Sequence, residues 1–123
     1  MFRRFLGDIG AEKSIRSITP QEAWERLSRP QSNSMLIDVR EPWEYSNGYA
    51  KGAKNIPLSQ LSQRFNEIPA DRDILLICQS GSRSRQAAAL LQQRNIPHVT
   101  NVTGGTSIWK VHGLPMEHGK HAR

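Results

Sequence analysis

A single cysteine, Cys78, stands where an apolar run meets a loop of small polar residues. The sequence across this junction is Ile74-Leu75-Leu76-Ile77-Cys78-Gln79-Ser80-Gly81-Ser82-Arg83-Ser84. Small side chains allow successive backbone N–H groups to converge above the sulfur, which creates an anion-binding nest. Arg83 adds planar donors for an oxyanion substrate or for the loop carbonyls. The pattern predicts a reactive thiolate rather than an inert core cysteine.

This chemistry requires ionisation, because the thiolate is the nucleophile and an unperturbed cysteine is only ~3% ionised at pH 7. Lowering its pKa by about two units takes roughly 2.7 kcal/mol. A helix amino terminus supplies ~0.3 to 2 kcal/mol, and a nearby arginine supplies ~1 to 4 kcal/mol. These contributions suffice without a general base, and the histidines of the chain have no obvious triad arrangement with Cys78.

Positioning this loop requires a buried strand before it and a helix after it. The run 74–77 is apolar throughout, as in a central parallel strand with helices on both faces. Further strands are predicted at 35–39, 53–57 and 99–102, and helices at 20–29, 41–45, 59–67, 84–94 and 105–109. The alternation predicts a three-layer α/β domain with parallel crossover units. Asp38 and Arg40 end a strand at the same active edge as Cys78.

The length of 123 residues predicts one domain, at 17–116, with a loose amino-terminal arm at 1–16 and a flexible tail at 117–123. One cysteine cannot form an intrachain disulfide, so we expect a reducing, cytoplasmic location. No stretch approaches the ~20 apolar residues that a membrane span needs, and we expect none.

The net charge of +6 is unevenly distributed. Ten of the eleven acidic residues precede Ile74, and none lies between Ile74 and Met116. We therefore expect Cys78 to lie in a cationic half of the molecule without local compensation, which favours an anionic ligand. Nucleic acid is not expected, because interleaved exposed aromatics and known motifs are missing. No metal site is expected, because the two tail histidines lack a third ligand.

Three motifs in chain order resemble those of single-domain rhodaneses, the thiosulfate sulfurtransferases. The first is Asp38-Val39-Arg40-Glu41-Pro42-Trp43-Glu44-Tyr45 followed by Gly48, Gly52-Ala53 and Asn55-Ile56-Pro57-Leu58. The second is the loop from Cys78 to Ser84, and the third is Thr103-Gly104-Gly105 with Trp109 and Gly113-Leu114-Pro115. The family usually has histidine after the first motif's glycine, where this chain has Tyr49, an aromatic of similar volume.

The resemblance implies a rhodanese-like domain with a five-stranded parallel sheet, no cofactor and a monomeric chain. It implies that Cys78 takes the outer sulfur of a small anionic donor, thiosulfate, as a persulfide. A thiophilic acceptor then removes this sulfur; it is cyanide in the assay and a thiol or a protein in the cell. The residues implied to bind the donor and the persulfide are Gln79, Ser80, Gly81, Ser82, Arg83 and Ser84. Asp38 and Arg40 are implied to support the loop.

Two alternatives remain open. A related loop serves cysteine phosphatases and arsenate reductases of the same fold, but the phosphatase pattern C-x5-R would place arginine where this chain has Ser84. Arsenate reduction would need an external thiol, because no second cysteine is present. The other alternative is a rhodanese-like module that carries a persulfide for a partner protein or docks on it, since an enzyme and a carrier use the same loop.

Overall fold

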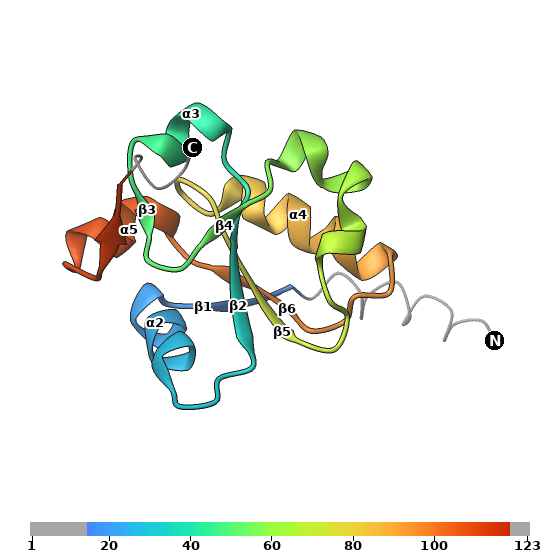
Figure 1. Ribbon diagram of the computed structural model, residues 1–123, viewed down its shortest axis with the longest axis horizontal. Coiled ribbons are helices and arrows are strands. Elements are labelled where there is room, and N and C mark those ends of the chain that lie inside the picture. Colours follow the sequence, from blue (N-terminus) through green and yellow to red (C-terminus); the bar gives the residue numbers. More distant parts are fainter. Residues whose placement is uncertain (1–14, 119–123) are drawn as a thin grey trace.

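The computed structural model describes residues 15–118. Its centre is a five-stranded parallel sheet with the strand order β1-β6-β5-β2-β4 (Figure 1). The strands are β1 (Arg16–Ile18), β2 (Ser34–Asp38), β4 (Lys54–Asn55), β5 (Asp73–Ile77) and β6 (Val99–Val102). A separate antiparallel pair is formed by β3 (Tyr49–Ala50) and β7 (Met116–Glu117).

Helices cover both faces of the sheet (Figure 1). One face carries α2 (Pro20–Ser28) and α5 (Gly105–Val111), whose Trp24 and Trp109 rings meet edge to face with centroids 6.1 Å apart. The other face carries α4 (Ser82–Gln93) and the 3-10 helices η1 (Leu58–Gln63) and η2 (Phe65–Glu67). The short helix α3 (Pro42–Ser46) follows the carboxyl end of β2. The predicted three-layer α/β class with a five-stranded parallel sheet is confirmed.

The central strand β5 is buried on both sides, which explains its unbroken apolar sequence. Ile74 and Leu76 pack with Cys78 on the α4 side, while Leu75 and Ile77 pack under α2 and α5. In the register of β2 and β5, Asp38 pairs with Ile77. Cys78 and the residues after Asp38 therefore leave the sheet side by side at its carboxyl edge.

The region predicted as one helix at 59–67 differs from that prediction. It consists of the two 3-10 helices, separated at Arg64, whose φ of −122° is not helical. Leu58 and Leu61 are three residues apart and both pack against the α4-side core, which is the spacing that a 3-10 helix places on one face. The α4 helix also begins two residues earlier than the predicted 84, at Ser82.

The predicted domain boundaries lie close to the ends of the described residues. Arg16 lies in β1 and Glu117 lies in β7, one residue beyond the predicted domain on each side. Residues 1–14 of the predicted arm and residues 119–123 of the predicted tail lie outside the described part of the chain.

Candidate functional site

Cys78 follows β5 directly and is 1% exposed. The chain then enters α4 through Gly81, whose φ of 107° lies in the left-handed region that glycine adopts without strain. This conformation lets the chain turn sharply between strand and helix, and α4 begins four residues after the cysteine. The partial positive charge of this helix end favours an anion at the sulfur.

Donors from the loop surround the Cys78 sulfur. The Gly81 N–H donates to Sγ at 3.1 Å, and the Ser84 hydroxyl oxygen lies 3.4 Å from Sγ. Burial raises the pKa of the thiol, whereas hydrogen bonds from the Ser84 side chain and from the backbone N–H groups of Ser84, Gly81 and Ser80 lower it. Together these hydrogen bonds outweigh the effect of burial, so the pKa of Cys78 lies below its ordinary value. The loop itself favours the thiolate.

The Ser84 hydroxyl is shared among three neighbours. Besides Sγ of Cys78, it contacts the Gly81 carbonyl oxygen at 3.2 Å and Oδ1 of Asn101. A hydroxyl has one proton to donate, so these groups compete for it. Asn101 comes from β6, the neighbour of β5, and is 2% exposed. Sequence reasoning missed Asn101, although an amide inside a buried strand signals a required polar partner.

Arg83 forms a two-pronged ion pair with Glu44 of α3. Its Nη1 and Nη2 atoms lie 2.7 and 2.9 Å from Oε1 and Oε2 of Glu44. The hydrogen bond to Arg83 is the main reason that the pKa of Glu44 falls from 4.5 to about 2. The expectation that no acid compensates the charge around Cys78 is therefore wrong, because an acid that precedes Ile74 in the sequence folds onto the loop.

Asp38 and Arg40 form a buried ion pair. Nε and Nη2 of Arg40 donate to the Asp38 carboxylate at 2.8 to 3.1 Å, and Nη2 also donates to the Gly48 carbonyl. The remaining nitrogen, Nη1, donates to Oε1 of Gln79 at 3.1 Å. Arg40 thus connects the end of β2 to the residue that follows the cysteine, which is the position expected of a loop-supporting group.

The start of α5 holds the other side of the loop. The Thr106 N–H and hydroxyl donate to the Cys78 carbonyl at 2.8 and 3.0 Å, and the Ser107 N–H donates to the Gln79 carbonyl at 3.1 Å. A Cβ added to Gly105 would lie 2.4 Å from the Cys78 carbonyl oxygen, so only glycine permits this approach. Sequence reasoning placed a turn here and missed these contacts, for which the glycine pair was the available signal.

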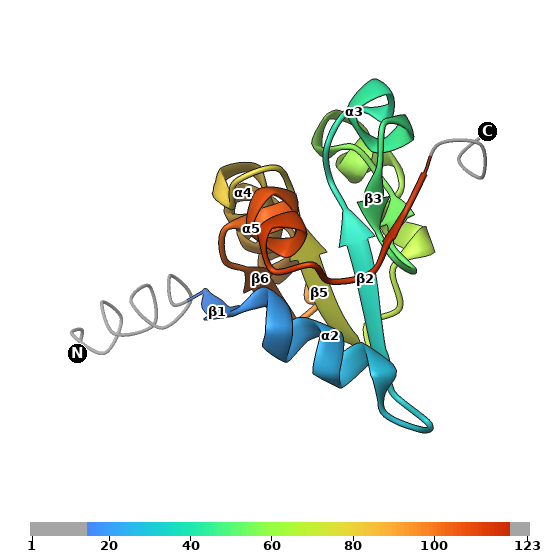
Figure 2. The same cartoon turned by 90° about the vertical axis from the view of Figure 1, so that its left-hand side faces the viewer.

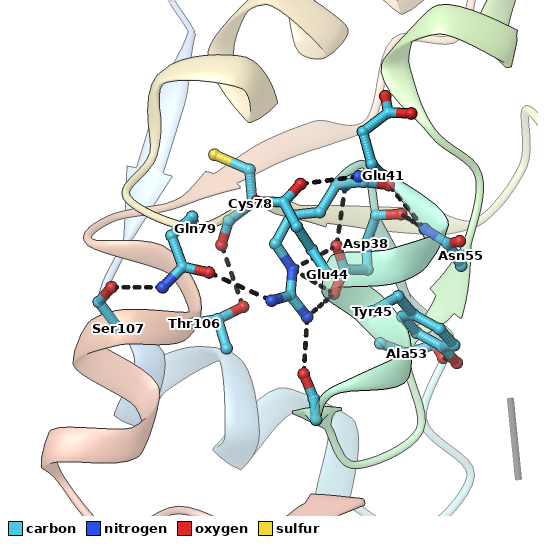
Figure 3. A network of polar contacts seen from close by, with 12 residues as sticks. Asp38, Glu41, Glu44, Tyr45, Ala53, Asn55, Cys78, Gln79, Thr106 and Ser107 are labelled. Atoms are coloured by element: carbon cyan, nitrogen blue, oxygen red, sulfur yellow. Dashed lines mark hydrogen bonds and ion pairs between the residues drawn. The ribbon is translucent and has the colours of Figure 1, made fainter. Parts of the chain in front are cut away.

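The remaining predicted loop residues, Gln79, Ser80 and Ser82, are exposed. The Gln79 side chain bridges Arg40 and Ser107, donating to the Ser107 hydroxyl at 2.9 Å (Figure 3). Ser80 contributes a backbone N–H to the sulfur environment. The structure therefore brings Ser80, Gly81 and Ser84 together around the Cys78 sulfur. The side chains of Gln79 and Arg83 instead point to residues outside the loop: Gln79 contacts Arg40 and Ser107, and Arg83 contacts Glu44.

Two hollows flank the loop. One, of about 380 Å³, lies between α3 and α5, and its lining includes Arg40, Trp43, Glu44, Gln79, Thr106 and Lys110. The other, of about 520 Å³, lies on the opposite side, and its lining includes Ser80, Gly81, Ser82, Arg85, Asn101 and Gly104. Cys78 is in the lining of neither hollow, although its loop neighbours Gln79 and Ser80 each line one of them.

Of the aromatics in the first motif, Trp43 lines a hollow and is 69% exposed. Tyr45 and Tyr49 instead stack with ring centroids 3.9 Å apart, and Tyr49 is buried. These two tyrosines are packing residues of the α3–β3 region.

Within residues 15–118, no group of three or more His, Cys, Asp and Glu side chains is arranged to hold a metal ion. No helix in the same range is long and apolar enough to cross a membrane.

The model of the family described as rhodanese-like domain matches residues 19–112. A protein named sulfurtransferase from Allochromatium vinosum is 36% identical over 102 residues, which are 83% of this chain and 94% of that protein. The thiosulfate sulfurtransferase GlpE from Actinobacillus succinogenes is 32% identical over 100 residues, covering 81% of this chain and 88% of GlpE.

A third relative, the uncharacterized protein YqhL from Bacillus subtilis, is 47% identical over 76 residues. This match spans 62% of the chain and 60% of YqhL. Among solved structures, a rhodanese-related protein from Thermoplasma volcanium superimposes with a TM-score of 0.75 at 30% identity, covering 83% of this chain and 97% of that one.

Proposed function

Since the chain belongs to the rhodanese-like domain family and is similar to sulfurtransferases, we propose that it is a thiosulfate sulfurtransferase acting through a persulfide on Cys78. The observation that carries the proposal is the ring of donors around the sulfur, which lowers the pKa of the thiol. The name of the GlpE relative supports thiosulfate as the donor. A single thiol in a ring of donors suits a reaction in which one sulfur anion replaces another.

In the first step, the Cys78 thiolate attacks the outer sulfur of thiosulfate. A sulfur–sulfur bond forms to Sγ, the bond between the two thiosulfate sulfurs breaks, and sulfite leaves with the electron pair of that bond. The product is a persulfide anion on Cys78. The Gly81 N–H and the amino end of α4 favour this anion as they favour the thiolate.

In the second step, a thiophilic acceptor attacks the outer sulfur of the persulfide. With cyanide, a carbon–sulfur bond forms, the sulfur–sulfur bond breaks, and Cys78 leaves as a thiolate while thiocyanate is released. Neither step needs a general base once the thiolate is present, because no proton is transferred at the reacting sulfur. The Ser84 hydroxyl instead stabilises each anionic state through a charge-assisted hydrogen bond.

Because Arg83 is paired with an acid, we assign it a structural role in the loop and not that of a free cation that binds the substrate anion. Its guanidinium spans the gap between the loop and α3 and shares its charge with Glu44. We propose that it fixes the loop in its curved form, and that the dianionic donor is attracted mainly by the loop N–H groups and the helix terminus. We also propose that the protein is a monomer of the reducing cytoplasm, where its one thiol stays reduced and can react.

The test is intact-mass spectrometry of the protein after addition of sodium thiosulfate. Wild type gains the mass of one sulfur atom, and cyanide then removes it and yields an equal amount of thiocyanate. The Cys78→Ser variant, which keeps size and polarity, gains nothing. If wild type gains no sulfur and instead hydrolyses an aryl phosphate, the protein is a cysteine phosphatase and the proposal is wrong.

A further inference from the structure

Asn101 is a polar residue in the middle of a buried strand. It belongs to β6, which lies between β1 and β5 in the sheet (Figure 2). Side chains alternate along a strand, and Val99 packs in the α4-side core, so the Asn101 side chain faces α4 as well. A buried amide costs free energy unless it is hydrogen-bonded, so the hydrogen bonds of this side chain decide what it contributes.

The amide of Asn101 lies between β1 and the start of α4. Its Nδ2 donates to the Ser17 hydroxyl on β1 at 3.4 Å, and its Oδ1 accepts from the Ser84 hydroxyl. An amide oxygen can only accept a hydrogen bond, so the Ser84 proton points at Asn101 whenever this bond is made. The same hydroxyl oxygen lies 3.4 Å from Sγ of Cys78, and either of these two atoms can be the donor. Asn101 and Cys78 are therefore connected through one proton.

The direction of the Ser84 proton depends on the charge of the sulfur. A neutral Cys78 thiol can donate its own proton to Ser84, which then donates to Asn101, and all three groups are satisfied. Once the thiol proton is lost to solvent, the thiolate only accepts, so the Ser84 proton turns from Asn101 to Sγ. The buried Oδ1 of Asn101 then loses a partner, which opposes ionisation of the thiol. The Gly81 carbonyl, 3.2 Å from the hydroxyl, is a further acceptor in both states.

The charged groups around the loop act on Cys78 independently of this proton. They are Asp38 and Arg40 at the end of β2, Glu41 and Glu44 at α3, Arg83 and Arg85 on α4, and Lys110 on α5. Asp38 pairs with Arg40, and Glu44 pairs with Arg83. An uncharged replacement of the Asn101 amide leaves these charges in place, so a change that it causes in the titration of Cys78 reports the Ser84 proton.

We propose that Asn101 is a positioning residue, which holds the Ser84 proton while Cys78 is a neutral thiol and yields it to the sulfur when the thiolate forms. Asn101 thereby opposes the N–H donors of the loop, which favour the thiolate. This opposition favours reactivity, because the intrinsic nucleophilicity of a thiolate falls as the pKa of its thiol falls. The link to sulfur transfer rests on the proposed sulfurtransferase function, whereas the exchange of hydrogen bonds is a property of the reduced protein.

The test titrates Cys78 in the reduced, full-length protein. Because the chain has one cysteine, the ultraviolet absorbance of the thiolate, with that of Cys78→Ser subtracted, follows this group alone. Asn101→Leu keeps the branched shape of the side chain without its polar atoms, and Asn101→Val removes the same atoms with a residue that strands favour. Each is also compared with Ser84→Ala and with the double variant Ser84→Ala/Asn101→Leu.

The matched control is Thr100→Val. Thr100 precedes Asn101 on β6, is also buried, and faces the opposite side of the sheet because side chains alternate along the strand. This variant removes a buried polar group from the same strand and should leave the midpoint of the Cys78 titration unchanged. Melting curves check that all variants are folded.

We expect Asn101→Leu and Asn101→Val each to lower the midpoint of the Cys78 titration by about one pH unit. This is about a tenfold change in the ionisation constant, the size expected for one buried hydrogen bond. The second readout is the rate of modification by methyl methanethiosulfonate, an uncharged reagent that thiolates attack at sulfur. At a pH above both midpoints, Asn101→Leu should react about threefold more slowly than wild type, because its thiolate is less nucleophilic.

An unchanged midpoint in both Asn101 variants would leave Asn101 a purely structural role and overturn the proposal. A raised midpoint would mean that the amide supports the thiolate, which also overturns it. In the Ser84→Ala background, Asn101→Leu should have no effect, and a shift that persists there would show that Asn101 does not act through Ser84. Failure of thiosulfate to load wild-type Cys78 refutes the proposed function, while a lowered midpoint in the Asn101 variants still supports the exchange of hydrogen bonds.

Discussion

The ion pair between Glu44 and Arg83 gives a prediction whose size and pH dependence both follow from its geometry. Replacing Glu44 by Gln keeps the shape of the side chain and removes its charge. The pKa of Glu44 falls from 4.5 to about 2 in the folded protein, which at face value corresponds to about 3 kcal/mol of stability. Because the Arg83 side chain is 33% exposed, solvent screening reduces this to roughly 1 kcal/mol.

The sign of the pH dependence follows from the lowered pKa. A carboxyl whose pKa is depressed by folding stabilises the protein above its unfolded value of 4.5, and this contribution is lost as the pH falls toward 2. Wild type should therefore be more stable than Glu44→Gln by roughly 1 kcal/mol at pH 7, or about 4 °C in melting temperature. The difference should shrink steadily below pH 4.5.

The assay is urea unfolding from pH 7 to pH 3 of wild type, Glu44→Gln, Arg83→Gln and the double variant. The coupling free energy of this cycle isolates the pair from the other contacts of each side chain. A coupling that is negligible at pH 7, or one that stays constant down to pH 3, would refute the reasoning. Thiosulfate kinetics of Glu44→Gln supply a second reading, because an unpaired Arg83 should lower KM for this dianion by about threefold.

Three further predictions concern the groups that hold the loop. Ser84→Ala removes the largest contribution that lowers the pKa of Cys78, so alkylation of the thiol by iodoacetamide at pH 7 should slow by roughly tenfold and its pH profile should move to higher pH; an unmoved profile would contradict the role of the hydroxyl. Gly105→Ala brings a methyl group to within 2.4 Å of the Cys78 carbonyl oxygen, and urea unfolding should show a loss of about 2 kcal/mol or more. Arg40→Met leaves the Asp38 carboxylate buried without its partner, which should cost about 3 to 5 kcal/mol in urea unfolding at pH 7; a loss below about 1 kcal/mol would contradict the role of Arg40 as the partner of a buried charge.

The elements that could be predicted from the sequence are those whose residue pattern is complete within one short stretch of the chain. The apolar run of β5 and the small residues after Cys78 identify a central strand and an anion-binding loop, because both faces of the strand and the backbone of the loop impose their residue types directly. By contrast, β1 has only Ile18 buried and β3 and β7 have two residues each, so none of them shows a period. The helix predicted at 59–67 has the right buried leucine but a tighter backbone.

The supports of the site are the part that a single sequence does not reveal. Glu44 meets Arg83 across 39 positions, and Asn101 meets Ser84 across 17. Such pairs depend on how the helices settle on the sheet, which pattern and spacing do not determine. Asp38 and Arg40 were predictable because they are close in sequence and end a strand at the active edge, yet the contact of Arg40 with Gln79 requires the register of β2 and β5.

The close approach of Gly105 to Cys78 has a consequence for the protein as it is being made. The sulfur's surroundings combine the loop with Asn101 and with Gly105 and Thr106, which leave the ribosome more than twenty residues after the cysteine. Until those residues emerge and α5 docks, the Cys78 carbonyl lacks its hydrogen bonds from Thr106. The Ser84 hydroxyl likewise lacks its contact with Asn101. The loop thus gains its supports from β6 and α5 only after the residues that form its anion-binding backbone have been made.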